Sequence, residues 1–437
     1  MKMKVGVARK IITPKIGARL YGYRTDVYSK SINDDLTATA IAFSSGEEMS
    51  MMFSLTVCLI DEFLCEEIRE KIYEVTNIPM HNIIISATHT HSGPCLAGNS
   101  GWGDIDSEYY KTILLPNVLD AAREALENMQ DASMGIGTTK SEVGINRREV
   151  LIDNTVDMTQ NPWGCFDPNM TLLSFKNKSG DIIANIIHYG AHCTAAGCNV
   201  EITRDWAGVM VDRVEKITGG ITMFFNGAEG DVGPRLSNGL TVGNIEYVNE
   251  LGGIAATDAM KAYNSITEYK DVEFGVITDD LSLPYDDVIS LEEAQKNVDE
   301  LESYTRENLA GRLYYHYVSV VDYYNGKGKL KDYYTFKQTI VKVGPVIFVP
   351  FPFEVFSEIS LRLRKYCKYP YVLSLSCTNG NNGYLPSSDQ ICRGGYEVQM
   401  FKSFDMQSLV EDTDSKIIQE NLRIIEKIDK DSSKKGE

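Results

Sequence analysis

Short apolar runs that stop abruptly at polar or glycine-rich turns recur along the chain. Such runs predict buried strands, although a short apolar run is also compatible with a helix. The runs cover residues 51–59, 82–86, 182–187, 221–225, 339–349 and 371–375.

Between these runs, apolar residues recur at spacings of three and four, which is the period of an amphipathic helix. Strands that alternate with such helices indicate an α/β fold, with a mixed central β-sheet flanked by helices. The expected helices cover residues 61–76, 107–129, 206–218, 247–263, 291–309 and 353–367.

No internal repeat or proline-rich linker divides the chain, so we expect one compact catalytic domain over residues 1–410. The tyrosine-rich stretch 285–335 is expected to be an insertion or a lid within it. From Asp412 onward a short helical pattern leads into a charged segment, and residues 411–437 are expected to form a helix with a frayed tail.

The composition is that of a folded globular protein, with 43% hydrophobic and 24% charged residues. A net charge of −18 repels phosphate backbones, and no basic stripe offsets it, so nucleic acid is excluded as a partner. Neither a signal peptide nor a membrane-spanning run is recognisable, so we expect a cytoplasmic protein without integral membrane contact. Nine cysteines without a Cys-x-x-Cys pair favour reduced thiols over a disulfide framework.

Polar side chains that could bind a metal or take part in catalysis lie directly after the predicted strands. In open α/β sheets, sites form beyond the carboxyl ends of the strands, so we expect these loops to converge. They carry His89 and His91 after 82–86, His188 and His192 after 182–187, residues 226–235 after 221–225, Glu354 after 339–349, and Tyr384 after 371–375.

Zinc in hydrolases is commonly held by three imidazole or carboxylate ligands, with a fourth position open to water. His89, His192 and Glu354 supply such a mixed nitrogen and oxygen set. Spacing alone leaves alternatives open. A histidine after a strand is commonly a hydrogen-bonded core residue. Glu354 could be a helix N-terminal residue favoured by the dipole, and Asp231 could cap or bend the chain.

Several motifs in a fixed order carry a resemblance to a known family. They are His-Thr-His-Ser-Gly-Pro at 89–94, Ala-His-Cys-Thr at 191–194, Thr-Arg-Asp-Trp at 203–206, Gly-Asp-Val-Gly-Pro at 230–234, Pro-Phe-Glu at 352–354 and Gly-Gly-Tyr-Glu at 394–397. With Ile-Asn-Arg-Arg at 145–148, the chain resembles the catalytic region of the neutral/alkaline (non-lysosomal) ceramidases. Residues after about Met406 match nothing in that family, so we expect no C-terminal immunoglobulin-like domain.

The resemblance implies a ceramidase-like fold and a zinc amidohydrolase site. It also implies that His91 transfers protons beside the zinc-bound water. Arg147 and Tyr396 resemble the family groups that contact the substrate carbonyl and its developing oxyanion. The implied zinc ligands are His89, His192, Glu354 and Tyr384.

One position departs from the family. Where ceramidases read Gly-Asp-Val-Ser-Pro, this chain has Gly233 in place of the serine, so a serine nucleophile is excluded here. Zinc-activated water would still permit hydrolysis, and we favour that mechanism. If the chemistry requires a covalent serine, the protein is a binding module or acts on a different bond.

We expect a small soluble amide, ester or lactone as substrate, and an N-acyl lipid stays open. Two other hypotheses remain: a catalytically inert, metal-containing binding protein, motivated by Gly233, and a phosphoesterase, because His, Asp and Glu clusters also hold two metals. Tyrosines between residues 314 and 334 could line a pocket, but they favour a packing surface or a homo-oligomer contact.

Overall fold

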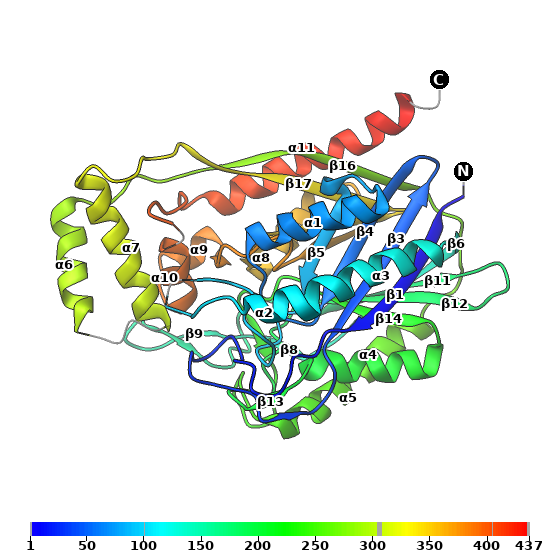
Figure 1. Cartoon of the computed structure of the whole chain (residues 1–437), viewed down its shortest axis with the longest axis horizontal. Helices are drawn as coiled ribbons and strands as arrows, with labels where there is room; N and C mark the ends of the chain where they lie inside the picture. The colour runs from blue at the N-terminus through cyan, green and yellow to red at the C-terminus, as the bar shows by residue number, and fades with distance from the viewer. Residues whose placement is uncertain (1, 100, 304–307, 404, 435–437) are drawn as a thin grey trace.

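The structure is a computed structural model that describes residues 2–99, 101–303, 308–403 and 405–434. Its longer strands form three sheets, of which the first has the order β5-β4-β3-β1-β6 (Figure 1). These strands are β1 (Lys4–Ile11), β3 (Thr37–Ser45), β4 (Glu48–Leu55), β5 (Ile83–Ala87) and β6 (Gln130–Asp131).

The other two sheets have four strands each. The second has the order β14-β12-β11-β7 and the third β16-β17-β18-β20. Their bounds are β7 (Ser133–Lys140), β11 (Asn169–Lys176), β12 (Ile182–Tyr189), β14 (Ile221–Asn226), β16 (Phe274–Pro284), β17 (Tyr333–Val343), β18 (Val346–Pro350) and β20 (Tyr371–Leu375). The α/β class with mixed sheets is therefore confirmed, and the strands divide among three sheets.

Each sheet contains one parallel strand pair, and a helix lies between its two strands in the chain. The pairs are β4 with β5, β12 with β14, and β18 with β20. Parallel neighbours need a crossover, and their carboxyl ends meet at the same edge of the sheet. The crossover helices are α1 (Glu62–Thr76), α4 (Asp205–Thr218) and α8 (Ser357–Tyr366).

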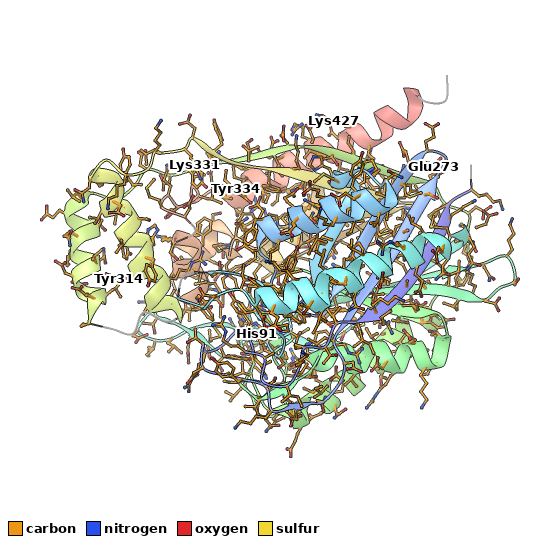
Figure 2. All side chains as sticks on the ribbon, viewed as in Figure 1. His91, Glu273, Tyr314, Lys331, Tyr334 and Lys427 are labelled. Carbon is orange, nitrogen blue, oxygen red and sulfur yellow. The ribbon has the colours of Figure 1, made fainter. Side chains whose placement is uncertain are left out.

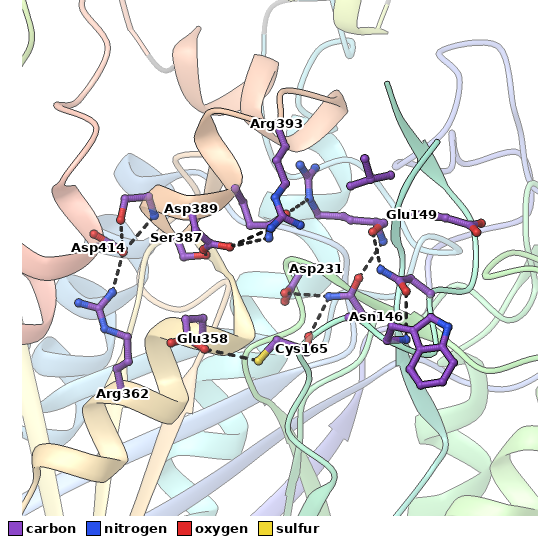
Figure 3. Close-up of a pocket in the computed structure, with 17 residues that line it drawn as sticks. Asn146, Glu149, Cys165, Asp231, Glu358, Arg362, Ser387, Asp389, Arg393 and Asp414 are labelled. Atoms are coloured by element: carbon purple, nitrogen blue, oxygen red, sulfur yellow. Dashed lines mark hydrogen bonds and ion pairs between the residues drawn. The ribbon is translucent and has the colours of Figure 1, made fainter. Parts of the chain in front are cut away.

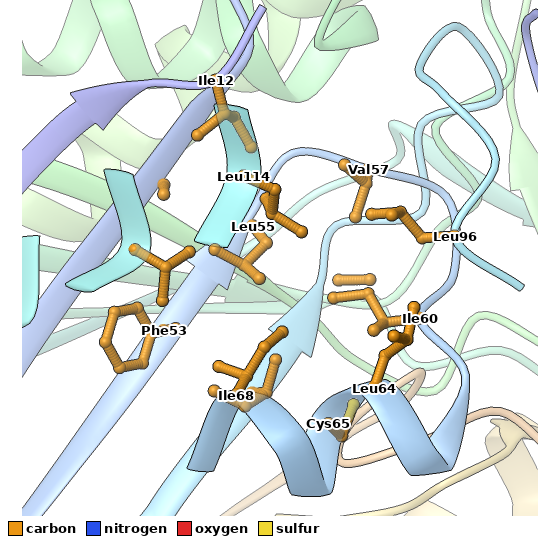
Figure 4. Packing of buried hydrophobic residues seen from close by; sticks show 14 of the residues in the cluster. Ile12, Phe53, Leu55, Val57, Ile60, Leu64, Cys65, Ile68, Leu96 and Leu114 are labelled. Carbon is orange, nitrogen blue, oxygen red and sulfur yellow. The ribbon is translucent and has the colours of Figure 1, made fainter. Parts of the chain in front are cut away.

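One apolar core is shared by the inner faces of all three sheets, where Phe43, Phe175, Phe225 and Phe348 are fully buried. Helices cover the outer faces (Figure 1). Figure 4 shows how α1 places Leu64 and Ile68 of its apolar face among the side chains of β4. Burying such a side chain contributes about 1.5–3 kcal/mol. The other covering helices are α3 (Leu115–Glu127), α5 (Ile245–Asn264) and α11 (Thr413–Lys434).

Three predicted elements differ in the structure. The predicted strand 339–349 is the hairpin β17–β18, because Gly344 turns the chain with a φ of 58°. The predicted helix 353–367 starts only at Ser357, since Glu354 and Val355 form strand β19 beside β21 (Tyr384–Leu385). The predicted helix 291–309 contains all of α6 (Leu291–Glu302) and the start of α7 (Asn308–Tyr324), and residues 304–307 fall outside the described residues.

Short strands and helices connect the longer elements. Helices α6 and α7 form a pair at one end of the molecule, marked by Tyr314 in Figure 2, while His91 lies nearer the centre. The short elements are β2 (Ser31–Ile32), η1 (Met80–Asn82), α2 (Ser107–Tyr109), η2 (Tyr110–Leu114), β8 (Gly144–Asn146), β9 (Arg148–Val150), β10 (Val156–Met158), β13 (Glu201–Ile202), β15 (Val232–Pro234), α9 (Ser388–Ile391) and α10 (Tyr396–Lys402).

Among the helices that the structure describes, none has the length and apolarity needed to cross a membrane. The cytoplasmic location and the division into a domain over 1–410, a lid over 285–335 and a tail remain predictions. Helix α11 packs Ile417, Ile424 and Ile428 into the core of the third sheet.

Candidate metal centre

The two histidine loops begin at the carboxyl ends of parallel strands and lie side by side. His89 follows β5 and His192 follows β12, and a parallel bridge joins Thr90 to Cys193 between them. His89 has a φ of 68°, a left-handed conformation that costs of order 1–3 kcal/mol in a residue other than glycine. A hydrogen bond from its backbone N–H to the carbonyl oxygen of Val57, at 3.0 Å, helps to hold it there.

Three acceptor atoms from distant segments converge on one point. Glu354 Oε2 lies 3.4 Å from His89 Nε2 and 3.2 Å from His192 Nε2, and all three residues are buried. No hydrogen-bond donor among the described residues reaches this carboxylate oxygen. A buried acceptor without a donor, facing two nitrogens, is an arrangement that a bound cation completes.

Hydrogen bonds at the other ring nitrogen orient both imidazoles. His89 Nδ1 lies 3.1 Å from the carbonyl oxygen of Cys58, and His192 Nδ1 lies 2.8 Å from that of Glu229. A carbonyl oxygen only accepts, so each Nδ1 carries the hydrogen and each Nε2 presents its lone pair toward Glu354. The residues therefore fit a metal ion bound through two Nε2 atoms and one carboxylate.

The protonation states agree with this donor set. Burial lowers the pKa of His89 and lowers that of His192 to about 3, so both rings are neutral at pH 7. The pKa of Glu354 is lowered although burial opposes its ionisation, so its carboxyl group is ionised at pH 7. Two neutral imidazoles and one carboxylate are ligands that Zn²⁺ commonly takes.

Tyr384 lies at the edge of this group. Strand β21 pairs with β19 so that Tyr384 stands opposite Glu354, and its Oη is 3.5 Å from His192 Nε2. Arg147 Nη2 donates a hydrogen bond to the same Oη at 3.0 Å. Burial raises the pKa of Tyr384 well above its usual range, so the side chain is a neutral phenol.

His91 lies next to the converging atoms. Its Nε2 is 3.1 Å from His89 Nε2, and its ring packs against that of Tyr23 with 4.9 Å between the centroids. Its Nδ1 has no hydrogen-bond partner among the described residues. Burial lowers its pKa well below the usual value, so His91 is also neutral.

Arg147 and Tyr396 complete the set of seven residues predicted from the sequence, all of which the structure brings together. The rings of Tyr396 and Tyr384 are 5.7 Å apart. Arg147 Nε donates to Glu397 Oε1 at 3.0 Å, and Arg148 binds the other oxygen of the same carboxylate. The sequence prediction gave Glu397 no role, although it follows Tyr396 directly in the Gly-Gly-Tyr-Glu motif.

Two alternatives left open by the sequence are now decided. Asp231 accepts hydrogen bonds from the backbone N–H and the hydroxyl of Ser357, both at 2.8 Å, so it caps the start of α8. Glu354 lies in strand β19 and not in a helix, so the helix dipole does not explain it. The neighbouring histidine His188 donates to the carbonyl oxygen of Ser374 at 2.8 Å and lies outside the metal group.

The Thr-Arg-Asp-Trp motif holds the His192 loop in place. Asp205, with a φ of 58°, accepts hydrogen bonds from the backbone N–H groups of Ala195 and Ala196 at 3.0 and 2.9 Å. Trp206 Nε1 donates to the carbonyl oxygen of His192 at 3.0 Å. The motif therefore positions a candidate ligand and contributes no ligand atom itself.

Gly233 lies in β15 against Thr241. A Cβ atom built on Gly233 would lie 2.5 Å from Cβ of Thr241, closer than real Cβ contacts come. Thr241 is 3% exposed, so its side chain fills the space that a longer residue at position 233 would need. The missing serine side chain has left no hole.

Two cavities adjoin this region. A small one of about 30 Å³ has room for about two water molecules and is lined by His89, His91 and Glu354 together with Tyr21, Trp102 and Met400. A larger one of about 720 Å³ is lined by Asn146 and Arg148 and by acidic and basic side chains such as Asp389 and Arg393 (Figure 3). In the larger one Arg362 pairs with Asp414 at 2.7 Å.

Comparisons with known proteins bear on the family. A family model described as neutral/alkaline non-lysosomal ceramidase, N-terminal, matches residues 3–243. Neutral ceramidase A of Dictyostelium discoideum is 28% identical over 222 residues, 45% of this chain and 30% of that protein. Neutral ceramidase B of the same organism is 29% identical over 171 residues, 35% of this chain and 24% of that protein. The matches thus span less than a third of the length of these relatives.

Two solved structures share the fold. The neutral ceramidase from Pseudomonas aeruginosa superposes with a TM-score of 0.74 at 15% identity, covering 97% of this chain and 73% of that one. A ceramidase complexed with C2 gives a TM-score of 0.71 at 14% identity, covering 97% and 75%. At these identities the likeness shows the fold alone.

Proposed function

The chain belongs to the neutral/alkaline non-lysosomal ceramidase family, and on this premise we propose that it is a zinc-dependent hydrolase of an amide or related acyl bond. The observation that carries the proposal is the convergence of Glu354 Oε2 with the Nε2 atoms of His89 and His192. These three residues, with Tyr384, are the proposed ligands. Zinc held there would polarise the substrate carbonyl and acidify a water molecule to a pKa of about 7.

His91 is the proposed proton carrier. It is neutral at pH 7 and its Nε2 lies beside the ligand atoms, so it can accept the proton of the attacking water there. It then gives that proton to the leaving nitrogen as the carbon–nitrogen bond breaks, and a carboxylic acid and an amine are released. An ester or lactone would release an alcohol in the same way.

Arg147 and Tyr396 are proposed to stabilise the oxyanion. Arg147 is fixed by its bond to Glu397, and Tyr396 keeps its proton because burial raises its pKa. A cation and a phenol held in place before the reaction stabilise developing charge best where water is excluded. Because position 233 is glycine, the proposed nucleophile is water and not a serine.

We propose a small amide as substrate, with an ester, a lactone or an N-acyl lipid as alternatives. The small cavity beside His91 supports this choice, because a long acyl chain would require a further opening. The names of the relatives favour an N-acyl substrate. Gly233 favours a second function, a catalytically inert metal-containing binding protein.

Metal analysis and a substrate screen test the proposal together. We expect one zinc per chain, and turnover of at least one N-acyl compound, ester or lactone that falls about 100-fold or more in His91→Ala while zinc is kept. Turnover that depends on His91 rules out the inert alternative. A pair of metals per chain would favour a phosphoesterase, and a metal-free protein of normal stability would contradict the metal site.

A further inference from the structure

Arg312 is a buried cation on the first turns of α7. It is 7% exposed, and its Nε donates to the hydroxyl and the carbonyl oxygen of Ser403 at 3.1 and 3.2 Å. Its Nη1 and Nη2 donate no hydrogen bond to a described residue. Burial lowers the pKa of Arg312, the direction expected when a cation leaves water.

Arg312 stands apart from the other buried arginines. Five arginines are less than 9% exposed within the described part of the chain, and Arg312 alone has no carboxylate within ion-pair distance there. A buried charge without a partner is costly, and a bound anion would offset that cost. The paired arginines are Arg69 with Glu66, Arg147 and Arg148 with Glu397, and Arg204 with Asp34 and Asp212.

The guanidinium faces the small cavity through Gly383. Gly383 and Met400 line the cavity, and a Cβ on Gly383 would lie 3.4 Å from Arg312 Nη2. Gly383 has a φ of 77°, so glycine both permits this turn and leaves the approach to Nη2 open. On the same face of α7, Leu309 packs against the cluster that contains Met400 and Tyr384.

We propose that Arg312 binds a carboxylate of the substrate, so that the acyl compounds cleaved are N-acyl amino acids. A guanidinium with two free N–H donors matches a carboxylate in a paired hydrogen bond. Hydrolysis of such a compound consumes one water and releases a carboxylic acid and an amino acid. The inference rests on the proposed function for its chemistry, while the binding of the carboxylate is independent of turnover.

Binding is measured first, on full-length protein carrying His91→Ala so that no substrate is consumed. Calorimetry compares N-acetyl amino acids with their C-terminal carboxamides, and phosphate and sulfate serve as further anions. We expect the carboxylates to bind at least about 30-fold more tightly than the carboxamides, and Arg312→Gln to remove that difference. Equal affinities for the two compounds, or a preference that survives in Arg312→Gln, would overturn the proposal. Tighter binding of phosphate or sulfate than of the carboxylates would also overturn it.

Turnover is the second readout, with the His91 residue intact. We expect Arg312→Gln to lower kcat/KM about 100-fold for N-acyl amino acids and far less for the carboxamides, with Arg312→Lys in between. Arg69→Gln, another buried arginine, controls for loss of stability and should not alter the preference. Turnover without any carboxylate preference contradicts the role of Arg312 but not the proposed hydrolase activity. Selective binding of carboxylates without turnover contradicts the hydrolase activity but not the role of Arg312.

Discussion

The candidate metal centre and the cavity wall beside it differ in what their unpaired polar atoms face. In the metal centre, backbone carbonyls fix both imidazoles, and the unpaired Oε2 of Glu354 faces their Nε2 atoms. In the wall that α7 and α10 form, Arg312 keeps two nitrogen atoms without a described partner. The difference suggests that the metal is held at the ends of the strands, whereas groups that contact the substrate come from helices packed beside them.

The strongest test of this division compares one residue from each side. His192→Ala should lose zinc and at least about 1,000-fold in kcat/KM, because it removes a ligand. Tyr396→Phe should keep zinc and lose about 10- to 100-fold, because it removes one donor to the oxyanion. Metal content and steady-state kinetics on the same preparations check both. Loss of zinc from Tyr396→Phe would show that the two sides are not separable.

A smaller effect on activity is expected from changing Glu397, whose carboxylate on α10 binds Arg147 and Arg148. Glu397→Gln leaves Arg147 and Arg148 buried without their counter-charge, which should lower the free energy of unfolding by about 3 kcal/mol. We also expect kcat to fall about 10-fold, since Arg147 is less firmly held. Glu358→Gln, at the larger cavity, is the matched control. Unchanged stability and kcat in Glu397→Gln would mean that the arginines find other partners.

The smallest effect concerns stability against pH. Burial, then the charge of Glu354, raises the pKa of Glu229 to about 8 from an ordinary 4.5. Between these values the unfolded chain has released a proton that the folded protein keeps, so this group lowers stability as pH rises. Glu229→Gln should therefore stabilise the metal-free protein by about 1–2 kcal/mol at pH 8 and hardly at pH 5. Urea unfolding at both pH values tests this, and an equal change at both would contradict it.

The sequence could predict which candidate ligands lie close together because its signals are local. A histidine directly after an apolar run marks the end of a strand, and ends of parallel strands meet, so His89 and His192 could be placed together without a structure. The three βαβ units could be predicted from the sequence for the same reason. Glu354 was placed in the right loop, although its strand β19 was taken as the start of a helix.

The other half of the site depends on contacts between segments far apart in the chain. Glu397 forms a hydrogen bond with Arg147, from which it is separated by 250 positions in the chain, and no periodicity in the sequence predicts such a pair. Arg312 lies in a tyrosine-rich stretch whose pattern does not predict its burial. The arginine is buried because α7 packs on α10. The hairpin at Gly344 was missed because two buried strands in succession look like one long apolar run.

The contact between Gly233 and Thr241 constrains how a serine could ever be gained at this position. A single Gly233→Ser change places its Cβ against that of Thr241, so the first step of such a path is disfavoured by overpacking. Only after Thr241 has become smaller does the serine fit, and the two changes are therefore coupled. The order of the two substitutions, and not merely their identity, thus decides whether a serine can be gained at position 233.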